Sequence, residues 1–125
     1  MNLAPFVRVD ETAFSASRAE ILSAWGAPVR WCRNSVGLNE LDYRSIRFQD
    51  CGRLEEITLQ APVVAMGVVA VPFSSLRPFV LAHDSEAFER EGFIISPKFG
   101  LAFDPHCPSW VTALAEHCID SWRAL

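Results

Sequence analysis

The stretch LDYRSIRFQDCGRLEEITLQ, residues 41–60, decides the fold. Its two halves, 41–48 and 53–60, consist largely of β-branched, aromatic or alternating residues. Asp50 to Gly52, between the halves, can turn tightly. This pattern predicts an antiparallel β-hairpin.

The second strand of this hairpin alternates along its length. Glu55 shares a face with Ile57 and Leu59, whereas Glu56 lies on the opposite face. We therefore expect one packed face and one solvated face. Because Glu55 and Glu56 would point in opposite directions, we do not expect them to act together in acid–base catalysis.

Two further regions predict strands. The run 63–71 contains no polar side chain, which is typical of a central strand covered on both faces, with Gly67 placed to form a bulge. Segments 93–95 and 99–103 predict another pair of strands, joined by a turn at 96–98.

Helices are predicted near both ends of the chain. Ser17 and Glu20 have the spacing of a capping box, and they begin a helix that ends at Trp25. The last helix begins near Pro108 and runs to the C-terminus. Its apolar residues form one wide stripe made of Trp110, Val111, Leu114, Ala115, Cys118, Ile119, Trp122 and Leu125.

Two shorter helices are predicted between these. Residues 74–75 can cap a helix that ends at His83, with Pro78 tolerated in its first turn. Residues 84–85 can begin another helix, which ends at Gly92.

The order of these elements indicates an α+β fold rather than alternating βαβ units. We expect one domain, residues 1–125, with a mainly antiparallel sheet, helices packed on it and a C-terminal amphipathic helix. Half of the residues are apolar and only 21% are charged, a composition that supports one hydrophobic core.

Charge and hydropathy exclude several classes of function. The formal net charge is -4 and the basic residues are scattered, which argues against a nucleic-acid partner. The longest apolar stretch, 61–73, is shorter than the roughly 20 residues that span a bilayer, so we expect no membrane segment. Residues 1–6 lack the features of a secretory signal, so we expect a cytoplasmic protein with four free cysteines.

The pattern with most chemical interest is a repeated dipeptide, His106-Cys107 and His117-Cys118. On the predicted helix the two copies are roughly 16 Å apart, too far to share one zinc ion. No family signature of a catalytic cysteine surrounds either copy. Glycine-rich cofactor loops, phosphate loops, nucleophile elbows and zinc-protease helices are missing from the sequence. We therefore predict no catalytic, cofactor-binding or metal-binding residue, and we predict that the protein is not an enzyme.

Aromatic residues offer a different function. The chain has four tryptophans, nine phenylalanines and one tyrosine, and Trp, Tyr and Arg commonly anchor protein interfaces. Our candidate partner-binding residues cluster around the predicted loop 34–39 and the first strand of the hairpin, and they are Trp31, Tyr43, Arg44 and Arg47. The alternative for each of them is an ordinary position on a sheet face.

A resemblance supports a protein partner. The run GFIISPKFGLAFDP at 92–105, followed by PSWVT at 108–112, resembles small bacterial immunity proteins of polymorphic toxin systems. The resemblance implies a cytoplasmic protein that binds and blocks a cognate toxin. It includes no catalytic motif, and it assigns no binding residue.

From these observations we predict a non-catalytic protein-binding domain, specifically an immunity protein that binds and neutralises a cognate toxin. The alternatives are a small-molecule binding or sensing domain and a homo-oligomeric structural protein, for which a homodimer is the simplest form. A deep apolar pocket would favour the first alternative, and a self-complementary apolar patch would favour the second.

Overall fold

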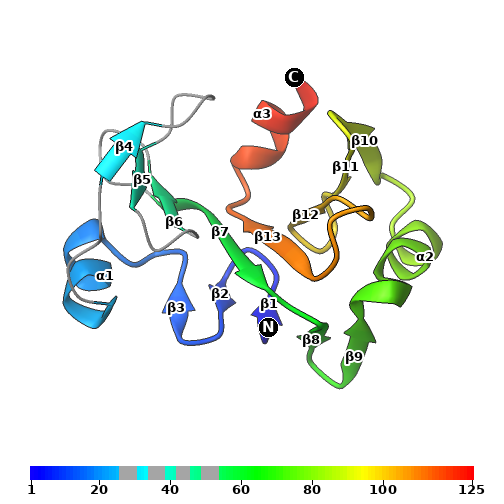
Figure 1. Ribbon diagram of the computed structural model, residues 1–125, viewed down its shortest axis with the longest axis horizontal. Helices are drawn as coiled ribbons and strands as arrows, with labels where there is room; N and C mark the ends of the chain where they lie inside the picture. Colours follow the sequence, from blue (N-terminus) through cyan, green and yellow to red (C-terminus); the bar gives the residue numbers. More distant parts are fainter. Residues whose placement is uncertain (26–30, 34–38, 42–45, 49–53) are drawn as a thin grey trace.

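The computed structural model describes residues 1–25, 31–33, 39–41, 46–48 and 54–125. Its main feature is an antiparallel sheet (Figure 1). The strands of this sheet follow the order β10 (Phe88–Arg90), β11 (Phe93–Ser96), β12 (Leu101–Phe103), β13 (Trp110–Leu114), β7 (Leu54–Gln60), β6 (Ile46–Phe48), β5 (Asn39–Leu41) and β4 (Trp31–Arg33).

Two smaller sheets and three helices complete the described part of the chain. The remaining elements are β1 (Leu3–Ala4), β2 (Arg8–Val9), β3 (Thr12–Ala13), β8 (Val63–Met66), β9 (Val69–Pro72), α1 (Arg18–Trp25), α2 (Phe73–His83) and α3 (Cys118–Arg123). Figure 1 shows α1 and α2 at opposite ends of the molecule. The predicted α+β fold with a mainly antiparallel sheet and a C-terminal helix is confirmed.

The sheet is buried on both faces where β11, β12 and β13 lie side by side. In β11, Ile94 belongs to the larger core, whereas Ile95 belongs to a second core beneath α3. In β12, Phe103 belongs to the larger core and Ala102 to the second core, because neighbouring strand residues point to opposite faces. The second core consists of Ile95, Ala102, Leu114, Ala115, Cys118 and Ile119.

The predicted hairpin is present, with a different first strand. β6 pairs antiparallel with β7, while the expected turn at 50–52 lies outside the described residues. The prediction of one strand over 41–48 was wrong, because β5 ends at Leu41 and β6 begins at Ile46. These two strands pair with each other, so the chain folds back once more than its residue pattern indicates.

β7 contains a bulge that changes the direction of its acidic side chains. Arg47 pairs with Glu56 and Phe48 pairs with Leu54, which leaves Glu55 as the extra residue. Glu55 and Glu56 are both buried, and both contact α3. The prediction of a solvated face around Glu56 was therefore wrong, since regular alternation does not hold across a bulge.

The apolar run 63–71 is not a central strand. It forms the hairpin β8–β9, with Met66 paired to Val69 across a two-residue turn. Gly67 has φ of +64° in that turn, a backbone conformation that glycine adopts without a steric penalty. The prediction was wrong because the run lacks polar residues but contains a turn former at its centre.

The long C-terminal helix was also predicted incorrectly. Residues Trp110–Leu114 form β13, which pairs with β12 on one side and β7 on the other. Only Cys118–Arg123 is helical at this end of the chain. A short apolar run fits a buried strand as well as a helix. Here the hydroxyls of Thr58 and Thr112, 2.8 Å apart on neighbouring strands, add a cross-strand pair.

The first predicted helix is confirmed and the middle two need correction. The Glu20 backbone N–H donates to Ser17 Oγ at 3.1 Å, as a helix cap requires. Helix α2 begins at Phe73 without a side-chain cap, so residues 74–75 lie inside it and Pro78 occupies its interior.

The predicted helix from 84–85 to Gly92 is not formed, because residues 88–90 are the edge strand β10. Asp84 instead accepts hydrogen bonds from Ser96 Oγ at 2.7 Å and from the Lys98 backbone N–H at 3.0 Å. Oδ2 of Asp84 thus binds the turn between β11 and β12, while its Oδ1 accepts a hydrogen bond from the Glu86 backbone N–H at 3.0 Å in a local turn that does not continue as a helix.

Candidate functional site

The four predicted partner-binding residues fall in the least described part of the chain. Trp31 lies in β4, where its backbone pairs with Leu41 at one end of the main sheet. Arg47 lies in β6, between β5 and β7. Tyr43 and Arg44 lie outside the described residues. A binding role for these four residues remains a prediction.

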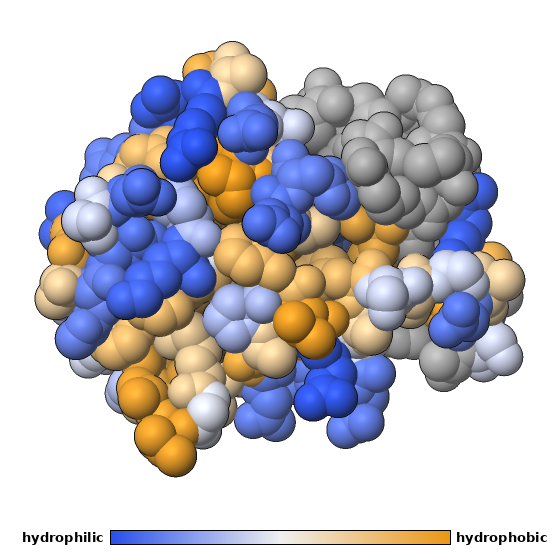
Figure 2. Space-filling view, turned by 180° about the vertical axis from the view of Figure 1, so that it is seen from behind, coloured by the Kyte–Doolittle hydropathy of each residue, from blue (hydrophilic) through white to orange (hydrophobic). Residues whose placement is uncertain are grey.

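A different apolar surface is well described, on the hairpin β8–β9. Val68 at the turn is fully exposed, and Val63 and Val69 are each more than 40% exposed. In Figure 2, which shows the molecule from behind, this hairpin projects at the lower left as an apolar tip. One face of the hairpin is anchored, because Val64 and Val71 are buried in the larger core. Val63 lies on the opposite face, Val69 lies on the anchored face but near the turn, and Val68 lies in the turn itself.

An open groove lies at the base of this hairpin. Its volume is about 480 Å³. Its lining is dominated by prolines and aromatic residues, and consists of Pro62, Pro72, Phe73, Ser74, Arg77, Pro78, Phe103, Pro105, Pro108 and Ser109. Pro62 precedes β8 and Pro72 ends β9, so the groove lies beside Val63 at the base of the hairpin, while Val68 and Val69 lie at the turn end. We call the valines and the groove together the hairpin surface.

The second candidate site is a side-chain cluster between β7 and α3. One oxygen of Glu55, Oε2, lies 2.5 Å from His117 Nε2 and 2.8 Å from Cys118 Sγ. His117 immediately precedes α3, Cys118 is its first residue, and the bulge of β7 supplies Glu55. We call Glu55, His117 and Cys118 the α3 cluster.

Burial controls the chemistry of the α3 cluster. The side chain of Glu55 is 3% exposed, whereas that of His117 is 35% exposed. Burial raises the pKa of the Cys118 thiol far above its ordinary value, and the hydrogen bond to Glu55 and the charges of Glu55 and Glu56 raise it further. A thiol that stays protonated is a poor nucleophile, so Cys118 is not suited to covalent catalysis.

The first His–Cys pair has a different environment. The backbone N–H of His106 donates to Asp104 Oδ1 at 2.8 Å, and Cys107 is exposed. The five residues of β13 lie between the two pairs. Sequence reasoning identified both pairs but missed Glu55, which is 62 residues from His117 and comes to it only through the pairing of β7 with β13. No local signal in the sequence could have indicated this contact.

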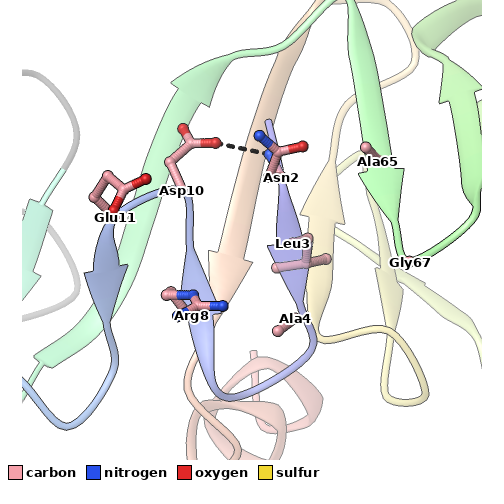
Figure 3. A pocket seen from close by; sticks show the side chains of 8 residues that line it. All are labelled: Asn2, Leu3, Ala4, Arg8, Asp10, Glu11, Ala65 and Gly67. Carbon is pink, nitrogen blue, oxygen red and sulfur yellow. Dashed lines mark hydrogen bonds between the residues drawn. The ribbon is translucent and has the colours of Figure 1, made fainter.

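A polar hollow of about 410 Å³ lies where the N-terminal sheet meets β8 (Figure 3). Arg8, Asp10 and Glu11 are among its lining residues. The backbone N–H of Asn2 donates to Asp10 Oδ1 at 2.7 Å, and Asn2 also forms a parallel bridge with Ala65. The hollow therefore follows the seam that joins β1 to β8, and its lining lacks the apolar walls typical of a ligand pocket.

Comparisons of the chain with family models, with curated proteins and with solved structures found no match. Among the helices of the described residues, none is long and apolar enough to cross a membrane.

Proposed function

We propose that this chain is a non-catalytic protein-binding domain, specifically a cytoplasmic immunity protein that binds and neutralises a cognate bacterial toxin. The observation that carries the proposal is the hairpin surface, with its fully exposed Val68 and the proline-rich groove at the base of the hairpin.

The hairpin is suited to insertion into a partner. A valine side chain left in water forgoes roughly 1.5–3 kcal/mol of burial free energy. Three exposed valines occur in one two-stranded hairpin, Val68 and Val69 at its turn and Val63 at its base, which is more informative than single exposed apolar residues scattered over a surface. The tight turn at Gly67 limits the conformational entropy that the hairpin would lose on binding.

The groove supplies the complementary half of an interface. Proline and phenylalanine side chains give it rigid apolar walls, and Arg77 places a guanidinium beside them. Arginine at the margin of an apolar patch is a common interface anchor, because it can bind a carboxylate or several carbonyl oxygens. We expect the partner to place an apolar side chain in the groove and an acidic group near Arg77.

The segment that resembles immunity proteins contributes to this groove. Phe103 and Pro105 come from the run 92–105, and Pro108 and Ser109 come from the run 108–112. Four residues of these two runs thus line the groove, and the other lining residues come from residues 62–78.

The test is co-expression of the chain with the protein encoded by the adjacent gene. We expect a stable one-to-one complex and protection of cells from that protein's toxicity. Val68→Asp should weaken the complex at least about tenfold, because it places a charge in the apolar contact. Leu125→Asp is the matched control, since Leu125 is also an exposed apolar residue, with 51% of it accessible. The C-terminus lies at the opposite edge of the molecule from the β8–β9 hairpin in Figure 1.

Each other outcome leads to a different function. A complex that Val68→Asp leaves unchanged would refute the hairpin surface as the binding site. A dimer of the chain that Val68→Asp dissociates, in the absence of any partner, would indicate the homo-oligomeric alternative. A neighbour that neither binds nor harms cells would refute the immunity function and return attention to small ligands.

A further inference from the structure

We propose that Glu55, His117 and Cys118 form a binding site for one zinc-class divalent metal ion. This inference does not rest on the proposed function, because it concerns the α3 cluster and needs no partner protein.

The three residues present three different ligand atoms to one point. The carboxylate oxygen, the imidazole nitrogen and the sulfur all lie within 4.8 Å of one another. Of the three atoms, Oε2 of Glu55 lies between the other two, because it contacts both His117 Nε2 and Cys118 Sγ. Two neighbouring residues at the beginning of a helix and one residue of a strand bulge therefore converge, although 62 and 63 residues separate them in the chain.

The chemistry of the donors selects the metal. Sulfur and imidazole are ligands for zinc and related transition-metal ions, whereas magnesium and calcium prefer oxygen alone. A mixed sulfur, nitrogen and oxygen set is therefore typical of zinc. With only three protein donors, a water molecule would complete the tetrahedron.

Small movements convert the observed contacts into coordination. Tetrahedral zinc at its usual bond lengths sets its donor atoms about 3.3–3.6 Å apart. The contacts of Glu55 are shorter than this, so the carboxylate would withdraw by less than about 1 Å as the ion enters. The partly exposed ring of His117 lies on the solvent side of the cluster, where an ion can reach it.

The backbone holds the two elements in register for this site. The N–H of Ala115 donates to the carbonyl oxygen of Glu55 at 2.9 Å, and the N–H of Cys118 donates to the carbonyl oxygen of Ala115 at 2.9 Å. These bonds fix the beginning of α3 against β7 without any metal. An ion would replace the contacts of Glu55 Oε2 with His117 and Cys118 by bonds. The thiol proton of Cys118 would be released to solvent, and the proton between His117 Nε2 and Glu55 would be released or carried on Nδ1, which leaves the Nε2 lone pair for the ion.

The experiment uses Co²⁺ as a spectroscopic substitute for zinc on the full chain, after treatment with a chelator. We expect one equivalent to produce a thiolate-to-cobalt charge-transfer band and the strong visible bands of tetrahedral cobalt, and one equivalent of Zn²⁺ to abolish both. Zn²⁺ should also raise the unfolding temperature, because it binds the folded chain.

Variants assign the signal to the α3 cluster. Cys118→Ser should remove the charge-transfer band, and His117→Ala should weaken zinc binding more than about 100-fold, since even outer-shell changes cost about 10–100-fold. His117→Ala is the more robust variant, because its side chain is one-third exposed and its loss should not disturb the core. The double variant His106→Ala/Cys107→Ser is the matched control, with the same dipeptide removed from the surface.

Three results would overturn the proposal. They are the absence of any cobalt band in the unaltered chain, a band that persists in Cys118→Ser, and a band that disappears in the control variant. The first would mean that the cluster is held by hydrogen bonds alone. The other two would place the ion elsewhere on the chain.

Discussion

The two His–Cys dipeptides of this chain are identical in sequence and opposite in environment. His106-Cys107 lies in the connection between β12 and β13, where Cys107 is exposed and Asp104 binds a backbone N–H. His117-Cys118 lies at the beginning of α3, where Cys118 is buried and contacts the carboxylate of Glu55. The difference teaches that the chemistry of such a pair depends on which strand the fold brings beside it.

The largest expected difference is in thiol reactivity. In the native, metal-free chain an alkylating reagent should modify Cys107 at least about 1000-fold faster than Cys118, because the reaction needs an accessible thiolate. Burial and Glu55 keep Cys118 protonated, whereas Cys107 is exposed. Peptide mass spectrometry of timed samples gives both rates. In denaturant the rates should become equal, and similar rates in the native chain would contradict the environment described for Cys118.

Stability provides the second difference. Glu55→Ala should lower the free energy of unfolding by about 2–4 kcal/mol, since it opens a cavity and removes the carboxylate acceptor of the buried Cys118 thiol, which keeps only the longer contact to the carbonyl oxygen of residue 55. Asp104→Ala removes the carboxylate that accepts the backbone N–H of His106 in the other dipeptide. It should lower the free energy of unfolding by only about 1 kcal/mol, because that hydrogen bond is exposed. Urea unfolding of both variants measures the two effects. Equal losses would mean that burial does not distinguish the sites.

The sequence predicts a segment correctly where its residue pattern fits only one kind of secondary structure. The cap at Ser17 and the pairing of β6 with β7 are set by local signals, and both are confirmed. The runs 63–71 and 110–114 have no polar residues spaced so as to distinguish a strand from a helix, and their patterns predict one strand for the first run and part of a helix for the second. Their structures follow from pairing with distant strands and from the turn at Gly67.

The candidate sites are less predictable than the fold. The sequence singles out His117 and Cys118 as half of a repeated dipeptide but predicts no metal-binding residue, and the only acidic residues near them in sequence are Glu116 and Asp120. Glu55 faces them because β7 pairs with β13 and because a bulge turns both of its acidic residues toward α3. A bulge has no reliable local signature, so the alternation rule assigned Glu55 and Glu56 to opposite faces. The exposed valines of β8–β9 were likewise hidden in an apparently buried run.

The third prediction concerns pH. The thiol pKa in an unfolded chain is about 8.5, and that of Cys118 is raised in the folded chain. The stabilising effect is complete below about pH 8.5, because the thiol is then protonated in both states. As the pH rises further, only the unfolded chain loses the proton, so the free energy of unfolding falls by about 1.4 kcal/mol per pH unit.

Urea unfolding between about pH 8.5 and 9.5 measures this slope in chelated protein. In Cys118→Ala the free energy of unfolding should no longer fall with pH by this amount, whereas in Cys107→Ala the slope should be unchanged. If both variants keep the slope of the unaltered chain, another group titrates in this range and the folded state does not hold the proton on Cys118.

The smallest predicted effect tests whether the second buried carboxylate also holds α3. Trp122 Nε1 donates to Glu56 Oε2 at 3.2 Å, and the ring packs against Phe93 with centroids 5.3 Å apart. Trp122→Phe keeps much of the ring contact but removes the donor, so it should cost about 1 kcal/mol. Trp110→Phe is the control, since Trp110 is 39% exposed and its replacement should change stability by less than about 0.5 kcal/mol.

The same variant sharpens the contrast between the two cysteines. If the bond to Glu56 helps to keep α3 docked, Trp122→Phe should speed the alkylation of Cys118 by about the factor that its loss of stability implies, roughly fivefold per 1 kcal/mol. The rate at Cys107 should not change, because that dipeptide precedes β13 and does not depend on the helix. Acceleration at Cys118 without any loss of global stability would mean that α3 opens locally. The protection of Cys118 would then come from helix docking rather than from the stability of the whole chain.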